Sequence, residues 1–410
     1  MTTGPDDTEL MPLVAELGRD LGDPDRAHDD LARIVWSCLA EPGDAVAGML
    51  IDAVGAPDAL RVARSARPHR VAPEAAGIPS ADWSNALQRW RPRMTAPDAG
   101  HALRIAAARG IRLLTPADDD WPRAVDDLGP HRPICLWVRG DPAVLGAPAA
   151  AVAIVGARAA TGYGEHVAAE LSAELAGRGV AVVSGGAYGI DGCAHRAALG
   201  VGGTTIAVMA GGVERAYPAG HTDLFERISA TGAVISEVPC GGAPTKWRFL
   251  ARNRVIAALG GATVVVEAGG RSGSLNTAGH AAALGRPLGA VPGPITSASS
   301  AGCHRLLREF DARCVTDADE VVELLDPGTL FDGPALRAAP APTGSAAPPT
   351  DDTMRVRDAL STRSRRCAED IARRAGMSTG DVEARLGLLL LAGEADRNPD
   401  GWALGSPRTR

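Results

Sequence analysis

Aromatic residues are scarce in this sequence, where Phe, Trp and Tyr together make up 3% of 410 residues. Cysteine occurs only as scattered single residues, with no C-x-x-C pair and no Cys/His spacing that suits zinc. A zinc site and a disulfide framework are therefore not expected. We predict reduced thiols at all seven positions: Cys38, Cys135, Cys193, Cys240, Cys303, Cys314 and Cys367.

Long apolar runs and an excess of positive charge are also missing. No stretch of about 18 uninterrupted apolar residues occurs, and the opening segment MTTGPDDTEL has neither the basic nor the apolar part of a secretory signal. We therefore expect a cytoplasmic protein without membrane contact. The net charge of -7 excludes a uniformly basic surface. It leaves room for a local basic groove, because nucleic-acid binding depends on the local field.

The common nucleotide fingerprints are absent as well. The segment VGARAATGYG lacks the G-x-G-x-x-G pattern, and no G-x-x-x-x-G-K-[ST] occurs. Neither NAD nor ATP is indicated, and no cofactor is expected.

Apolar periodicity divides the chain into segments. Residues 9 to 92 have helical spacing, which predicts a small N-terminal helical domain over residues 1–95. Its segment LIDAVGAPDAL is either half of a helix-hairpin-helix that contacts a DNA backbone, or a simple turn between two helices.

Residues 101–327 alternate short apolar runs with amphipathic stretches. Near-continuous apolar strands separated by helices are typical of a parallel sheet that is covered on both faces. We predict an α/β fold, an extended Rossmann-like doubly wound mostly parallel sheet. The expected strands are residues 152–155, 180–183, 204–209, 234–236, 263–266 and 288–291.

The last part of the chain begins with a linker. Residues 328–352 are rich in Pro, Ala and Gly without periodicity, as in extended linkers. Residues 353–410 follow with three helical segments and a hairpin centred on Asn398-Pro399-Asp400-Gly401. Three helices and a hairpin predict a C-terminal winged-helix domain, and the linker is expected to isolate it from the phosphate-binding turns of the sheet.

Three glycine-rich turns each follow a predicted strand. Turns of this kind lie at the carboxyl ends of parallel strands, where ligands bind. Glycine allows an anion to approach the backbone, and nearby N–H groups and hydroxyls donate hydrogen bonds. We predict a phosphate-binding site from three sets of residues: Gly156, Ala157 and Arg158; Ser184, Gly185 and Gly186; and Ser272, Gly273, Ser274, Asn276 and Thr277.

A basic and aromatic segment, KWRFLARNR, covers residues 246–254 and contains no acid. Cations can follow the phosphates of a single strand while an aromatic ring stacks on an unpaired base. The alternative is a solvated helix start whose aromatic residues belong to the core. From this segment we predict DNA contacts by Lys246, Phe249, Arg252, Asn253 and Arg254.

Four further polar residues are weaker candidates. Asp191 and His195 have the spacing of one helical turn, which suits either a catalytic pair or a structural hydrogen bond. Glu237 and Glu267 end strands and can orient a ribose or a basic side chain. No Ser/His/Asp order or second metal-ligand carboxylate accompanies them. No catalytic residue is therefore predicted.

Together the motifs resemble a known family. VAIVGARAATGYG, VSGGAYGIDGCAH, TIAVMAGGVERAYP, SEVPCGGAPTKWRFLARNRVIAAL, VVVEAGGRSGSLNTAGHAAALGRPLGAVPG and SAGCHRLL are similar to the DprA/Smf family of DNA-processing proteins. The resemblance covers residues 110 to 325. It implies a non-enzymatic protein that binds single-stranded DNA, forms a homodimer and helps to load RecA recombinase during bacterial transformation. Other competence or single-strand-binding proteins are further expected partners.

Carried over by position, the family's Gly-Ser-Arg phosphate motif falls on Gly156, Ala157 and Arg158. Ala157 stands where serine is usual, so one hydroxyl donor is lost. In the winged helix, acidic residues accompany Arg385 on the expected recognition helix. That charge balance favours a protein contact or an auxiliary DNA contact over sequence-specific readout.

Two other functions remain as alternatives. A nucleotide-processing phosphoribohydrolase-like enzyme uses a related Rossmann sheet with a P-G-G-x-G-T-x-x-E motif. The segment GGRSGS at residues 269–274 lacks the Pro-Gly-Gly start and the glutamate of that motif. A protein-only scaffold would leave the basic segment 246–254 without a role.

Overall fold

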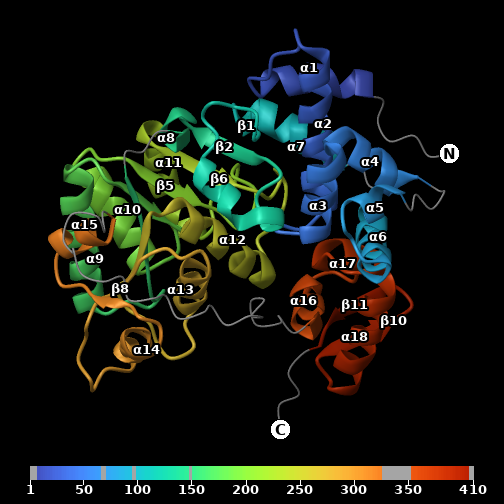
Figure 1. The fold of residues 1–410 in the computed structure, drawn as a ribbon. Coiled ribbons are helices and arrows are strands. Elements are labelled where there is room, and N and C mark those ends of the chain that lie inside the picture. The colour runs from blue at the N-terminus through green and yellow to red at the C-terminus, as the bar shows by residue number, and fades with distance from the viewer. Residues whose placement is uncertain (1–6, 66–70, 95–97, 147–149, 326–351, 406–410) are drawn as a thin grey trace.

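The computed structural model describes residues 7–65, 71–94, 98–146, 150–325 and 352–405 (Figure 1). Its centre is a nine-stranded sheet with the order β1-β2-β6-β5-β4-β3-β7-β8-β9. Strands β1 and β2 pair antiparallel at one edge, and the strands from β6 to β9 are parallel. The strands are β1 (Arg112–Leu114), β2 (Leu136–Gly140), β3 (Ala151–Val155), β4 (Ala181–Ser184), β5 (Thr205–Val208), β6 (Ala233–Ser236), β7 (Ala262–Val265), β8 (Leu288–Ala290) and β9 (Arg313–Cys314). The doubly wound, mostly parallel sheet predicted from the sequence is confirmed.

The connection order creates a switch point between β3 and β7. From β3 the chain adds β4, β5 and β6 on one side, and it then returns to place β7 on the other side of β3. Val155 at the end of β3 pairs in register with Val265 at the end of β7. Ligands of doubly wound sheets bind where the winding direction reverses, at the carboxyl ends of the strands.

Helices cover both faces of the sheet because successive strand residues are buried on opposite sides. Ala153 and Val155 pack with α12, α13 and α14, whereas Val152 and Ile154 pack with α9, α10 and α15. Helix α11 packs at β2, β5 and β6. These helices are α9 (Gly162–Gly177), α10 (Ile190–Gly200), α11 (Thr222–Thr231), α12 (Lys246–Leu259), α13 (Ser274–Ala283), α14 (Ala301–Glu309) and α15 (Ala318–Leu325). The same part of the chain also contains the short helix α8 (Ala143–Gly146) and the 3-10 helices η1 (Arg123–His131), η2 (Ala219–His221) and η3 (Ala298–Ser300).

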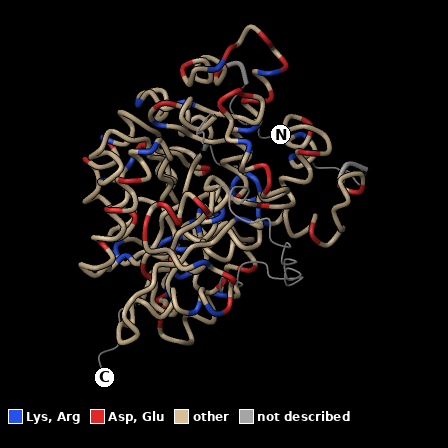
Figure 2. Tube along the Cα trace, turned by 60° about the vertical axis from the view of Figure 1, so that its left-hand side comes forward, with Lys and Arg blue, Asp and Glu red and all other residues tan. Residues whose placement is uncertain are grey.

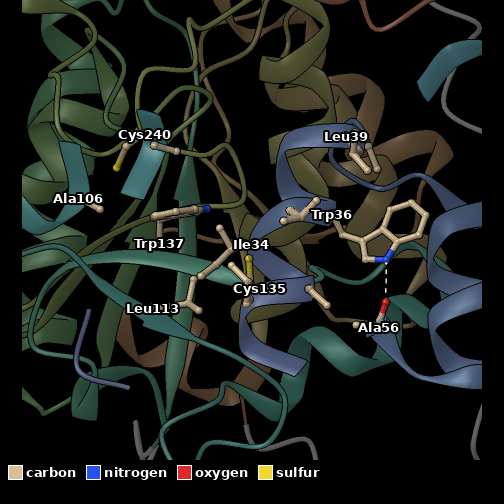
Figure 3. Close-up of a cluster of buried hydrophobic side chains, with 14 of the residues drawn as sticks. Ile34, Trp36, Leu39, Ala56, Ala106, Leu113, Cys135, Trp137 and Cys240 are labelled. Carbon is tan, nitrogen blue, oxygen red and sulfur yellow. Dashed lines mark hydrogen bonds between the residues drawn. The ribbon is translucent and has the colours of Figure 1, made fainter. Parts of the chain in front are cut away.

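The N-terminal part is helical, as predicted. Trp36 and Trp90 meet edge to face in its core, with ring centroids 5.0 Å apart. The core continues into the sheet through Leu113, Cys135 and Trp137 (Figure 3). The helices are α1 (Asp7–Glu16), α2 (Pro24–Leu39), α3 (Ala45–Val54), α4 (Ala56–Arg64), α5 (Val71–Ala75), α6 (Ser80–Met94) and α7 (Asp98–Ala108). The boundary near residues 95–101 remains a prediction, and the apolar core runs across it.

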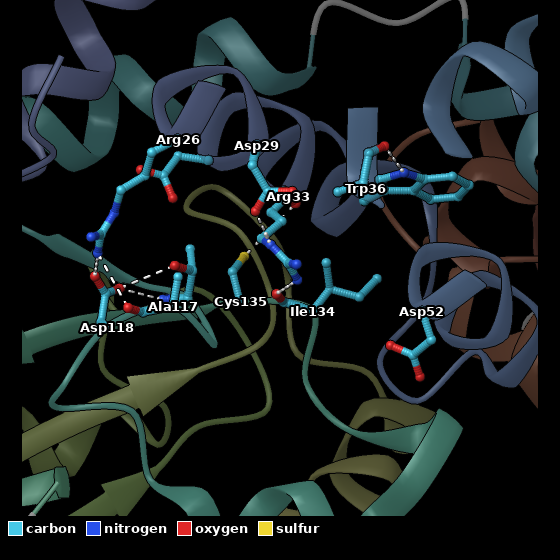
Figure 4. Close-up of polar contacts among 12 residues, drawn as sticks. Arg26, Asp29, Arg33, Trp36, Asp52, Ala117, Asp118, Ile134 and Cys135 are labelled. Carbon is cyan, nitrogen blue, oxygen red and sulfur yellow. Dashed lines mark hydrogen bonds and ion pairs between the residues drawn. The ribbon is translucent and has the colours of Figure 1, made fainter. Parts of the chain in front are cut away.

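Polar contacts also tie α2 to the edge of the sheet (Figure 4). Arg26 forms an ion pair with Asp118. The Arg33 guanidinium binds Asp29 at 2.6 Å and donates to the Ile134 carbonyl at 3.1 Å. Because these arginines lie on one helix and contact two separate connections, they fix the angle of α2 on the sheet.

The C-terminal winged helix is confirmed. It consists of α16 (Asp352–Ala359), α17 (Ala368–Ala375), α18 (Thr379–Leu391), β10 (Ala395–Asn398) and β11 (Gly401–Leu404). Its own core gathers Val356, Ile371, Val382 and Leu386.

The expectation that the linker isolates this domain is wrong. In the structure α17 and α18 pack on α6, and α16 packs on α12. Figure 1 shows the red helices seated beside α6 and below α12. Of the predicted linker, only Asp352 lies within the described residues.

Charges of both signs are interspersed along the whole described trace (Figure 2). Among the helices that the structure describes, none is long and apolar enough to cross a membrane.

Candidate nucleic-acid interface

A groove of about 880 Å³ opens at the switch point of the sheet. Its walls come from the turn after β3, from one face of α12 and from the turn after β7. Of the residues predicted from the sequence, the groove is lined by Gly156, Ala157, Arg158, Lys246, Phe249, Arg252, Asn253, Ser272, Gly273, Ser274 and Thr277. The structure therefore brings the first and third glycine-rich turns together with the basic segment.

Helix α12 presents two different faces. Thr245 caps its first turn by accepting a hydrogen bond from the Arg248 amide at 3.3 Å. Lys246, Phe249 and Asn253 follow at helical spacing and line the groove. Arg248 lies on the other face, where it binds Glu41 with two hydrogen bonds of 3.0 Å. The sequence segment that looked uniformly basic is thus divided between the groove and the domain contacts.

Phe249 is the centre of an aromatic and cationic cluster. The Arg158 guanidinium lies 4.8 Å from the centroid of its ring, and the Tyr217 ring lies 5.4 Å away at a tilt of 50°. Arg158 is exposed, and no carboxylate of the described residues forms an ion pair with it. An exposed cation beside two rings can meet a phosphate while a ring stacks on a base.

Arg252 lies deeper and holds the groove floor together. It donates to the carbonyl of Gly185 at 2.7 Å and to the carbonyl of Val208, which joins α12 to the ends of β4 and β5. Burial lowers the pKa of Arg252 to about 10, and the negative charge of Asp191 limits this lowering. Because this pKa lies well above neutral pH, the guanidinium stays protonated there. A Cβ atom at Gly185 would come within 2.3 Å of this guanidinium. Gly185 is therefore needed for close approach of Arg252.

Asn253 positions the turn after β7. Its side-chain amide donates to the Gly273 carbonyl at 3.3 Å and to Asn276 Oδ1 at 3.2 Å. In the same turn the hydroxyls of Ser272 and Ser274 lie 2.7 Å apart. Asn276 thus supports the turn from behind and is not part of the groove wall.

Glu267 joins the first turn to the third. It accepts hydrogen bonds from the Thr161 amide at 2.9 Å, the Thr161 hydroxyl at 2.6 Å and the Ser299 hydroxyl at 3.1 Å. At Gly156, a Cβ atom would meet Ile190 at 2.6 Å, so only glycine allows this packing. The Gly156 packing fixes the backbone before Arg158, and the Thr161 contacts fix the backbone after it.

Besides Asn276, four predicted DNA-contact residues do not line the groove. Ser184 is buried and donates to the Ile154 carbonyl at 2.6 Å. Gly185 lies under Arg252, and Gly186 packs on Phe225, where a Cβ atom would come within 2.5 Å of the ring. Arg254 is buried in an ion pair with Glu237. The buried contacts of these residues give them structural roles. The prediction that Arg254 binds a phosphate is wrong, because Arg254 is the partner of Glu237 in an internal ion pair.

Asp191 and His195 do not form the pair that their spacing allowed. The Asp191 carboxylate accepts from the Ala187 amide at 3.3 Å and lines the groove, while His195 contacts the Thr205 hydroxyl at 2.7 Å. Burial raises the pKa of Asp191, with Arg252 opposing that shift. Within the described residues, no group of three or more His, Cys, Asp or Glu side chains is placed to hold a metal ion.

Sequence reasoning missed several groove residues, and three of them come from segments outside the predicted turns and α12. Tyr217 lies in the loop after β5, Ser299 in η3, and Asp358 belongs to the winged helix. An aromatic residue in a loop that follows a parallel strand was a usable signal for Tyr217. The position of Asp358 depends on how two distant segments pack, which no local pattern encodes.

This combination of a doubly wound sheet, a cationic groove at its switch point and a C-terminal winged helix defines a Rossmann-like protein with an added winged-helix domain. The family model of DNA recombination-mediator protein A matches residues 112–326, and that of the DprA winged helix domain matches residues 340–401. The chain therefore belongs to the DprA/Smf family of DNA-processing proteins.

Individual relatives support the same family. The chain is 46% identical over 316 residues to the putative DNA processing protein DprA of Mycobacterium tuberculosis, covering 75% of this chain and 80% of that protein. It is 38% identical over 255 residues to the protein Smf of Escherichia coli, covering 61% and 67%. The crystal structure of DprA from Streptococcus pneumoniae superimposes with a TM-score of 0.58 at 29% identity, covering 72% of this chain and 96% of that one.

Proposed function

We propose that this protein binds single-stranded DNA in the groove between the turn after β3, α12 and the turn after β7. One observation carries the proposal: Arg158, Lys246, Phe249 and Tyr217 line the same groove, which is bordered by glycine and serine turns. Cations there neutralise phosphates, backbone amides and hydroxyls donate to them, and the rings stack on bases.

In this proposal the protein is a binding protein without a catalytic step of its own. It protects single strands in the cytoplasm and helps to load RecA recombinase during DNA uptake, transformation and recombination, acting as a homodimer. The RecA contact and the homodimer rest on membership of the DprA/Smf family. The groove itself supports the DNA contact.

The groove also predicts which form of DNA is preferred. Backbone contacts do not depend on base identity, and rings stack on any unpaired base. We expect tighter binding to an oligo-dT strand than to a duplex of equal length, measured by fluorescence anisotropy at two salt concentrations. Equal affinity for the two forms would contradict the proposal.

Arg158 gives a sharper test. If it neutralises one phosphate, Arg158→Ala should make the slope of log affinity against log salt shallower by about 0.7. The melting temperature should barely change, because exposed substitutions usually cost less than about 0.5 kcal/mol. A matched control is Arg178→Ala, which removes an exposed arginine at the end of α9 that does not line the groove.

Two results would point elsewhere. If Arg158→Ala unfolds the protein and leaves the salt slope of the folded fraction unchanged, Arg158 is a structural residue. If the wild-type protein turns over a nucleoside monophosphate and Arg158→Ala abolishes that turnover, the groove belongs to an enzyme.

A further inference from the structure

The winged helix reaches the lip of the groove through α16. Met354 Sδ contacts the Lys246 ammonium, and Asp358 on the next helical turn lines the groove itself. A thioether is a weak acceptor, and the Asp358 carboxylate places a negative charge where phosphates are proposed to bind. The docked winged helix therefore contacts Lys246, one of the proposed phosphate-binding side chains. Its Asp358 carboxylate also repels a polyanion.

The docking rests on a cluster of charged residues outside the groove. Glu41, which follows α2, binds both Arg93 of α6 and Arg248 of α12. Its carboxylate is only 10% exposed. Burial alone would raise the pKa of Glu41, but the charges of Arg248 and Arg93 outweigh it and hold the pKa well below its ordinary value.

This cluster continues directly into the winged helix. The Arg93 guanidinium donates to the Arg373 carbonyl of α17 at 2.9 and 2.7 Å. Gly376 sits so close to Glu41 that a Cβ atom there would come within 2.4 Å of it. Glu41 and Arg93 thus form the contact on which the end of α17 rests.

A second contact lies between α16 and α12. The Arg355 guanidinium stacks 4.8 Å from the centroid of the Trp247 ring, and it also donates to the Ala375 carbonyl at 2.7 Å. Trp247 and Lys246 are neighbours at the start of α12. The surface that holds the winged helix is therefore continuous with the DNA-binding face of the same helix.

We propose that docking of the winged helix and binding of a DNA strand at Lys246 exclude each other, so that the docked form is an autoinhibited state of the groove. The proposal rests on the function proposed above and adds its regulation. A strand that reaches Lys246 displaces Met354 and Asp358, and the contacts of α17 with Arg93 and Glu41 open with them.

The first test is hydrogen exchange of the intact wild-type chain, free and saturated with oligo-dT. The segments to follow are the end of α6 around Arg93 and the end of α17 around Gly376, which do not line the groove. We expect both to lose amide protection when the strand binds. Unchanged or increased protection at saturation would overturn the proposal, because the strand and the docked winged helix would then coexist.

The second test loosens the docking in the full-length chain. Glu41→Gln leaves Arg93 and Arg248 without their acid and should favour the open state. The apparent Kd for oligo-dT is the intrinsic Kd divided by the fraction of the protein in the open state. If Glu41→Gln raises that fraction about fivefold, it should bind oligo-dT about fivefold more tightly. The matched control is Glu237→Gln, which removes the acid partner of another arginine of α12, Arg254, without contacting the winged helix.

Equal or weaker binding by Glu41→Gln, in a protein whose circular dichroism is unchanged and whose α17 has lost protection, would also overturn the proposal. Failure of the proposed function looks different. In that case the wild-type protein and Glu41→Gln would both leave the oligonucleotide unbound, whatever the state of the winged helix.

Discussion

Tyr217 extends the aromatic wall of the groove beyond Phe249. Its side chain is 48% exposed, and no other aromatic residue lies as close to the Phe249 ring in the described structure. A ring that is exposed in a groove, and held by a second ring, is suited to stack on an unpaired base. Stacking of a base on an aromatic side chain contributes about 1–3 kcal/mol.

We therefore expect Tyr217→Ala to weaken oligo-dT binding by about fivefold or more, since 1.4 kcal/mol is about tenfold. Tyr217→Phe should keep the affinity because the ring remains. Tyr163→Ala is the control: Tyr163 is 43% exposed, but its hydroxyl donates to the Pro292 carbonyl at 2.6 Å and it does not line the groove. Equal losses for Tyr217→Phe and Tyr217→Ala would assign the effect to the hydroxyl and not to stacking.

His195 makes the stability of the sheet depend on pH. Burial lowers the pKa of His195 to about 3, with the charge of His221 acting in the same direction. The Thr205 hydroxyl donates to the Val182 carbonyl, so it accepts from His195 Nδ1, and Nε2 has no partner among the described residues. The unfolded chain takes up a proton near pH 6.5, whereas the folded chain does not until about pH 3.

Below pH 6.5 the unfolded state therefore binds more protons, and the free energy of unfolding falls as the pH falls. For one such histidine the loss between about pH 7.5 and about pH 5.5 is about 1.4 kcal/mol. We expect urea unfolding of His195→Leu to show a pH dependence smaller by this amount, whatever its absolute stability. His166→Gln, a change at a histidine with 76% exposure, should leave the pH dependence as in the wild type. An unchanged pH dependence in His195→Leu would show that this imidazole is protonated alike in both states.

At the scale of elements, the sheet was predictable and the use of α12 was only partly so. Apolar runs such as Val152–Val155 identify buried parallel strands, and the position of a glycine turn after each strand follows from parallel topology. That reasoning correctly placed the turns after β3 and β7 in one groove. It also placed Ser184, Gly185 and Gly186 of the turn after β4 there, whereas only the end of that turn, at Ala187, lines the groove.

The charges of α12 show why local pattern was insufficient. Charge and aromatic content predict one surface for residues 246–254. In a helix only residues three or four apart share a face, so neighbouring residues point in different directions around the axis. Lys246 and Phe249 face the groove, Arg248 faces Glu41, and Arg254 faces Glu237. Helical spacing alone could have separated Arg248 from Lys246. The acids that pair with Arg248 and Arg254 lie on distant segments, so their roles required the tertiary structure.

At the scale of the whole molecule, the winged helix has a hydrophobic core of its own and packs on α6 and α12. Its apolar cluster, which includes Val356, Ile371 and Leu386, is separate from those of the sheet and the N-terminal helices. Its contacts with them run through Arg93, Glu41 and Trp247. A chain without residues 328–410 should therefore keep its sheet and its groove, with a lower melting temperature where the docking surface is newly exposed.

Binding by this truncated chain distinguishes two roles of the winged helix. If the DNA site lies on the sheet, the truncated chain still prefers oligo-dT over duplex DNA. If Met354 and Asp358 restrain the groove, it binds at least as tightly as the full chain. The bound strand reaches Lys246 in both chains, so the salt slope should be the same while the affinity of the truncated chain is higher. Lys246→Ala in the truncated background is the control, because it should make the slope shallower by about 0.7 and leave the contribution of Arg158. A truncated chain that is folded by circular dichroism yet binds no single strand would place the main DNA site on the winged helix, and the groove at the switch point would lose its proposed function.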